Sequence, residues 1–155
     1  MRPRRPLQLG RILDTGMIRV PPEGRLDAPI ALIGESPGRQ ESIKGRPFIG
    51  PSWDRRLQPW LVSVGLTRGD LYITNVVKDY YGATSADLPT DLDLRPHFQA
   101  LLHELIATHP RVVVPCGALA LAALWHLHLF QSTAKAKWAT PLAVMPSFTK
   151  LGKLK

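Results

Sequence analysis

Short apolar runs that alternate with helical patterns of apolar residues constrain the fold of this chain most. Four runs have the length and composition of strands, and they cover residues 29–33, 71–74, 111–116 and 142–145. Segments with apolar side chains at helical spacing lie between them, over residues 53–64, 94–108 and 118–128. Strands that alternate with helices in this way form a parallel sheet with helices on both faces. We therefore predict an α/β fold, a three-layer α/β/α sandwich around a central, mainly parallel four-stranded sheet.

The length and the Pro distribution divide the chain into an arm and one domain. The 155 residues are enough for a single domain with a buried core. Residues 1–28 are rich in Arg and Pro and show no sustained periodicity, so we interpret them as a basic arm that packs on the domain or stays mobile. Residues 29–155 then form the single domain.

The charge of the chain points to a polyanionic partner. Lys and Arg number 20 against 12 Asp and Glu, which gives a net charge of +8. Nucleic acid is the first candidate and an anionic membrane surface the second. The alternative is a small domain that is basic for no specific reason, because a moderate net charge also serves solubility.

The single cysteine, Cys116, excludes several classes of site. An internal disulfide framework and a zinc or iron–sulfur site built from thiolates each need more than one cysteine. One thiol suits a reducing compartment, and no run reaches the ~18 to 20 apolar residues of a membrane span. The basic amino terminus lacks the apolar core of a signal peptide. We therefore expect a cytoplasmic protein, monomeric and without membrane association.

Chemically capable residues follow the predicted strands. Ligands of open parallel sheets bind at the carboxyl ends of the strands, and those ends are followed here by residues 35–38, Asn75, Gly117 and residues 146–147. A carboxylate, a carboxamide and small-residue turns would thus converge on one crevice. The first of these loops matches neither G-x-x-x-x-G-K-[ST] nor G-x-G-x-x-G, which disfavours a nucleotide-binding protein.

Four stretches around this crevice form a pattern in order and spacing. They are Gly34-Glu35-Ser36-Pro37-Gly38 with Glu41, Gly45-Arg46-Pro47-Phe48-Ile49-Gly50, Tyr72-Ile73-Thr74-Asn75-Val76-Val77-Lys78, and Met145-Pro146-Ser147. The pattern resembles the uracil-DNA glycosylase superfamily, most closely the branch that usually carries an iron–sulfur cluster, and it covers residues 29–147. The resemblance implies an enzyme of base-excision repair that hydrolyses the N-glycosidic bond of uracil, or of a modified uracil, in DNA.

The resemblance also implies roles for the matched residues. Glu35 and Glu41 occupy the acidic positions that would stabilise the sugar cation and position the attacking water, and the resemblance does not rank them. Phe48 would stack on a flipped base, and Asn75 would read its hydrogen-bonding edge. Contacts to the DNA backbone would come from Pro37, Gly38, Arg39, Lys78, Pro146 and Ser147. Taken singly, Phe48 could be ordinary core, Asn75 a turn cap and the glutamates solvated charges.

Three departures from the family pattern qualify these expectations. Asp79 stands where a cluster cysteine often follows, so we predict no iron–sulfur cluster and no other cofactor or metal. Met145 replaces the His that helps stabilise the departing base, and losing one such donor costs roughly 10² to 10³ in rate. Ser36 replaces the usual Ala. Met145 and Ser36 both belong to the predicted base-binding set, with Phe48 and Asn75. The alternative function is therefore a catalytically impaired glycosylase-fold protein that binds DNA or a base.

Overall fold

The computed structural model describes residues 11–12, 17–82 and 87–132. The strands in this part of the chain are β1 (Arg11–Ile12), β2 (Ile18–Arg19), β3 (Glu23–Gly24), β4 (Ile30–Gly34), β5 (Leu71–Asn75) and β6 (Val112–Pro115). The helices are α1 (Arg39–Lys44), the π-helix η1 (Trp53–Leu57), α2 (Gln58–Ser63), the 3-10 helix η2 (Arg68–Asp70), α3 (Arg95–Thr108) and α4 (Ala118–Ser132).

The central sheet is mixed and mainly parallel, as predicted. Within the described residues it has four strands in the order β3-β5-β4-β6, and β4 runs parallel to both of its neighbours. The register pairs Gly34 with Asn75, so β4 and β5 end side by side. The fourth strand of this sheet is β3, which pairs antiparallel with β5. The strand predicted over residues 142–145 lies outside the described residues.

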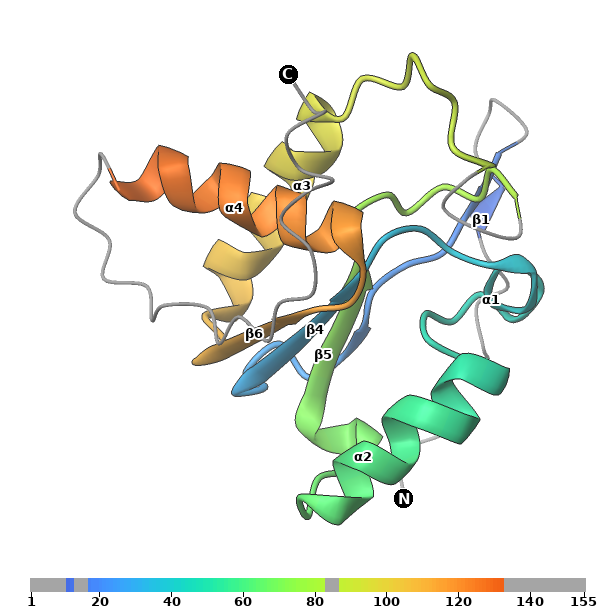
Figure 1. Ribbon diagram of the computed structural model, residues 1–155, viewed down its shortest axis with the longest axis vertical. Coiled ribbons are helices and arrows are strands. Elements are labelled where there is room, and N and C mark those ends of the chain that lie inside the picture. The colour runs from blue at the N-terminus through green and yellow to red at the C-terminus, as the bar shows by residue number, and fades with distance from the viewer. Residues whose placement is uncertain (1–10, 13–16, 83–86, 133–155) are drawn as a thin grey trace.

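Helices cover both faces of this sheet, which makes the predicted three layers. Figure 1 shows α3 and α4 on one face and α1 and α2 on the other. The side chains of β4 alternate accordingly, because successive residues of a strand point to opposite faces. Ala31 and Ile33 pack in the cluster that contains Leu101 of α3, whereas Leu32 packs with Trp53 and other residues on the α2 side.

Part of the predicted arm packs on the sheet. The Val20 N–H donates to the Lys78 carbonyl over 2.9 Å, and the Tyr80 N–H donates to the Ile18 carbonyl over 2.8 Å. Val20 and Ala28 are buried. The division of the chain at residue 28 stays a prediction. Of the helices in the described ranges, none is both long and apolar enough to cross a membrane.

Candidate functional site

A pocket of about 440 Å³ opens where β4 and β5 end. This volume lies in the range of small-molecule sites, roughly 300 to 1,000 Å³. Of the residues predicted from the sequence, the pocket lining includes Glu35, Ser36, Gly38, Arg39, Glu41, Phe48 and Asn75. The loop after β4 and the end of β5 therefore do converge on one crevice, because the two strands are parallel neighbours in register.

Gly34 brings Phe48 and Asn75 together at this pocket. A Cβ atom added to Gly34 would lie 2.2 Å from Asn75 Oδ1 and 2.7 Å from Phe48 Cε2, closer than real Cβ atoms approach other groups. Only glycine lets both side chains lie against the backbone at this position. The carboxamide and the aromatic ring thus both lie close to the end of β4.

The Asn75 carboxamide carries an unused donor. Asn75 is 3 % exposed, and its Nδ2 has no hydrogen-bond partner among the described residues. A buried donor without a partner costs about 1 to 3 kcal/mol, so such groups in native proteins call for an explanation. Asn75 lines the pocket, so its carboxamide lies beside the space that a ligand would occupy.

Phe48 has a backbone conformation that is rare for an aromatic residue. Its φ is 52°, in the left-handed region that L side chains seldom adopt. Its N–H donates to Glu41 Oε1, and its carbonyl accepts a hydrogen bond from Arg68 Nη1 over 2.7 Å. Strained backbone of this kind persists where the surroundings fix it, and it gathers at functional sites.

Glu41 braces the loop between β4 and η1. Its Oε2 accepts the Gly38 N–H and its Oε1 accepts the Phe48 N–H, so both carboxylate oxygens are engaged by the backbone. Burial raises the pKa of the Glu41 carboxyl, although the two N–H donors act in the opposite direction. In this geometry Glu41 ties the start of α1 to the residue that carries the aromatic ring.

Glu35 is held at the amino end of α4. Its Oε1 accepts the Leu119 N–H over 2.7 Å, a favourable place for a carboxylate because the first helical N–H groups lack partners within the helix. Gly117, with φ +104°, makes room for it, because a Cβ there would lie 2.5 Å from Glu35 Cδ. No hydrogen bond to Oε2 is found within the described part of the chain. Of the two predicted catalytic carboxylates, both of which line the pocket, Glu35 is the one with an oxygen that accepts no hydrogen bond among the described residues.

The DNA contact of Lys78 stays a prediction, and the structure places this side chain in the interior. Lys78 is 5 % exposed, and its Nζ donates to the Asn75 carbonyl over 2.8 Å and pairs with Glu104 Oε1 at 2.7 Å. Burial lowers the pKa of Lys78, although Glu104 acts in the opposite direction. A charged residue after a strand can turn inward when a helix on that face supplies a carboxylate, and the motif alone does not show that carboxylate.

Two residues of the first loop that were predicted to contact the DNA backbone are engaged within the protein. The Pro37 side chain is fully buried. The Gly38 N–H donates to Glu41 Oε2. Arg39 is exposed and lines the pocket, and its contact with the DNA backbone stays a prediction. Met145, Pro146 and Ser147 lie outside the described residues.

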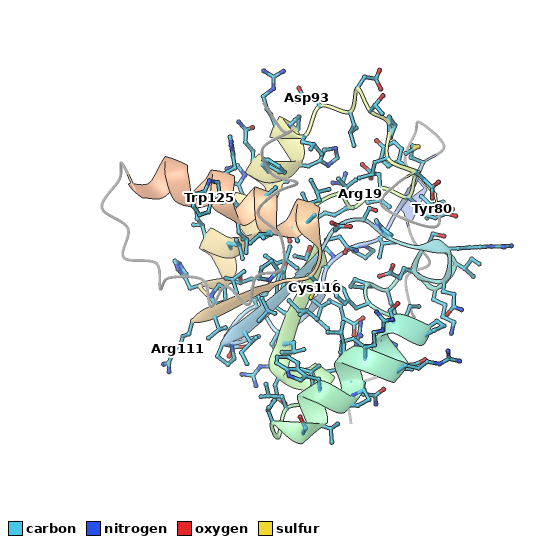
Figure 2. All side chains as sticks on the ribbon, in the orientation of Figure 1. Arg19, Tyr80, Asp93, Arg111, Cys116 and Trp125 are labelled. Carbon is cyan, nitrogen blue, oxygen red and sulfur yellow. The ribbon has the colours of Figure 1, made fainter. Side chains whose placement is uncertain are left out.

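Sequence reasoning missed several residues of the pocket wall. Trp53 and Leu57 line it from the π-helix η1, and Trp53 is 7 % exposed. The spacing of these apolar residues predicted a helix, but it did not show which residues of the helix face a cavity. Cys116 lines the pocket directly after β6, and Figure 2 shows it near the centre of the molecule, close to the start of α4. Burial raises the pKa of its thiol to about 11.

The residues of this chain do not fit a cluster held by several thiolates. Asp79, at the position of the expected cysteine, forms a β-bridge with Arg19, and the two side chains lie 3.7 Å apart as an ion pair. Cys116, the one cysteine of the sequence, lines the pocket instead. Within the described residues no group of three or more His, Cys, Asp or Glu side chains could hold a metal ion.

Comparison with known proteins places this site in a family. The chain is 38 % identical over 108 residues to the type-4 uracil-DNA glycosylase of Archaeoglobus fulgidus, a match that covers 70 % of this chain and 53 % of the relative. For the type-4 uracil-DNA glycosylase of Thermotoga maritima the identity is 38 % over 100 residues, covering 64 % and 50 %. For that of Pyrobaculum aerophilum it is 32 % over 108 residues, covering 70 % and 54 %. The chain thus spans about half the length of these relatives. Residues 21–152 match the family model of the uracil DNA glycosylase superfamily, and the chain belongs to that superfamily.

Proposed function

We propose that this chain is a DNA glycosylase that hydrolyses the N-glycosidic bond of uracil, or of a modified uracil, in DNA. The observation that carries the proposal is the buried Nδ2 of Asn75, which has no hydrogen-bond partner among the described residues and belongs to a residue that lines the pocket beside Phe48. A site that flips a base needs a stacking surface and a polar group that reads the base edge, and these two residues supply both. The relatives named as type-4 uracil-DNA glycosylases support the same activity.

Base recognition follows from the donors and acceptors of one carboxamide. Uracil presents the O4 acceptor beside the N3–H donor, so Asn75 Nδ2 would donate to O4 while Oδ1 accepts from N3–H. Phe48 would stack on the face of the base, and Ser36 would line the remaining side. Met145 belongs to the proposed base-binding set on the family pattern alone.

Glu35 is the carboxylate that we assign to the chemistry. Breaking the N-glycosidic bond leaves positive charge on the sugar and negative charge on the departing base, and water then attacks C1′ to leave an abasic site. A carboxylate fixed by Leu119 and Gly117 would stabilise the sugar cation and orient that water. Glu41, with both oxygens engaged by the loop, supports the site by shaping it.

The partner in this proposal is uracil-containing DNA. The net charge of +8 favours binding to a polyanion, and Arg39 at the pocket edge would meet the backbone together with Pro146 and Ser147. We expect the protein to act without an iron–sulfur cluster, as a monomer in the cytoplasm. Iron analysis and the hydrodynamic mass of the purified protein test the first two points.

A second candidate function is favoured by one residue. Met145 stands where the family pattern has a His, and a thioether cannot donate a hydrogen bond to the departing base. The second candidate is therefore a protein that binds DNA or a flipped base without cleaving the N-glycosidic bond. Both candidates predict salt-sensitive DNA binding, so binding alone does not separate them.

Strand cleavage separates them. A labelled single-stranded oligonucleotide with one uracil is incubated with the protein and treated with alkali, which cuts the strand at abasic sites. We expect cleavage by the native protein, its loss in Asn75→Ala and faster cleavage by Met145→His. No cleavage by the native protein or by Met145→His, with DNA binding intact, would leave the binding function.

A further inference from the structure

The unusual backbone of Phe48 needs a restraint on both of its sides. Its N–H is held by the Glu41 carboxylate, and its carbonyl is held by the Arg68 guanidinium. Arg68 Nη2 also donates to the carbonyl of Pro47, the preceding residue. Two opposite charges thus fix one residue at a φ of 52°, a conformation that an aromatic side chain does not favour by itself.

Arg68 is itself fixed from two directions. Its guanidinium lies over the ring of Trp53, with the central carbon 4.6 Å from the ring centroid. Its Nε donates to Glu23 Oε1 over 2.8 Å, and its Nη2 lies 3.1 Å from Glu23 Oε2. A forked pair with a carboxylate combined with stacking on an aromatic face is a geometry that Arg adopts and Lys cannot.

Glu23 links this network to β3. Burial raises the pKa of Glu23, but the hydrogen bonds and charges of Arg46 and Arg68 outweigh it and lower the pKa to about 2. Arg46 binds the same carboxylate over 2.7 and 2.8 Å. Unlike Arg68, Arg46 makes no side-chain hydrogen bond to the carbonyls of Pro47 or Phe48 among the contacts of the described residues.

We propose that Arg68, anchored by Glu23 of β3, is a positioning residue that holds Phe48 in its left-handed conformation and so sets the ring for stacking on the base. The inference rests on the proposed function, because stacking matters only if the pocket receives a base. The proposal assigns a positioning role to Arg68, which lies outside the matched motifs. It also means that the short edge strand β3, through Glu23, supports the site.

The kinetic test compares Arg68→Gln with Arg46→Gln, since both variants remove an ion pair from Glu23 and only the first releases the loop carbonyls. We expect the single-turnover rate of uracil excision to fall about 100-fold in Arg68→Gln, because misplacement by about 1 Å has that effect. The rate should change less than threefold in Arg46→Gln. In a Phe48→Ala background, Arg68→Gln should add no further loss, because it acts through that ring. Equal losses in both Arg variants, or losses that multiply with Phe48→Ala, would overturn the proposal.

A conformational test keeps this inference separate from the proposed function. A positive φ gives a strong NOE between the amide and α protons of the same residue, which NMR measures at Phe48 without any catalysis. We expect the strong NOE in the native protein and in Arg46→Gln, its loss in Arg68→Gln and an intermediate signal in Arg68→Lys. Arg68→Lys keeps the charge and provides a folded variant if Arg68→Gln does not fold. A positive φ retained in Arg68→Gln, or in Arg68→Lys where Arg68→Gln does not fold, would overturn the proposal. If the native protein releases no uracil, the proposed function fails while this measurement still decides the role of Arg68.

Discussion

Replacement of Gly34 by Ala should disable the site while leaving the fold in place. The new Cβ would lie 2.2 Å from Asn75 Oδ1 and 2.7 Å from Phe48 Cε2, which is about 1.2 and 0.7 Å short of the 3.4 Å where ordinary contact begins. Both side chains must therefore move by about 1 Å, and a displacement of that size costs about 10²-fold in rate. We expect overpacking to lower the free energy of unfolding by about 1 to 3 kcal/mol.

The assay for Gly34→Ala is single-turnover uracil excision at a temperature where both proteins are folded. Gly69→Ala is the matched control, because the nearest atom to its new Cβ is Thr67 Oγ1 at 3.6 Å, an ordinary contact. The control should keep the native rate within about threefold, whereas Gly34→Ala loses about 10²-fold. A folded Gly34→Ala with the native rate would refute the close packing of Phe48 and Asn75 against this residue.

Three further predictions concern ionisable groups. Because the folded pKa of Glu23 is about 2, below its ordinary value of 4.5, its ion pairs stabilise the protein above about pH 4.5 and the effect is lost as the pH falls toward 2. Glu23→Gln should therefore lower the free energy of unfolding by about 1 to 2 kcal/mol at pH 7, after solvent screening, and by almost nothing near pH 2. Urea titrations measure both values, and an equal loss of stability at the two pH values would contradict the prediction. Lys78→Met should lower the free energy of unfolding in urea by about 3 kcal/mol, because it leaves Glu104 without its cation. The same substitution should not change the salt dependence of DNA binding, and a changed salt slope would show that Lys78 contacts DNA. Alkylation of Cys116 by iodoacetamide should keep accelerating up to about pH 11, and a plateau near pH 9 would be inconsistent with its burial.

The strands and helices of the core were predictable because their signals are local. The run at residues 29–33 became β4, the run at residues 71–74 became β5, and the helix expected over residues 94–108 is α3. Apolar runs and helical spacing report burial directly, so these elements needed no knowledge of their partners. β3 was not predictable, because Glu23 and Gly24 have no strand signal, and their pairing with β5 is a long-range property.

The site was predictable where motif and topology agree. Parallel strands in register bring Asn75 beside Gly34, so the convergence of the first loop and β5 follows from the sheet alone. The direction of charged side chains was not predictable, as Lys78 shows, because it depends on Glu104 of α3. The same holds for Glu41, whose oxygens bind the loop, and for Arg68, which no motif marked.

The most direct test of this account follows the side-chain amide of Asn75 during binding of a uracil base. An oligonucleotide with one 2′-fluoro-2′-deoxyuridine, which resists cleavage, is titrated into ¹⁵N-labelled protein, and the same strand with cytosine in that place is the comparison. We predict that the Asn75 Nδ2–H signals shift saturably with the uracil strand, because this donor, which has no partner in the described part of the chain, then meets O4. The cytosine strand should leave these signals unchanged. Saturable binding of the uracil strand with unmoved Asn75 signals would contradict the assignment of this pocket.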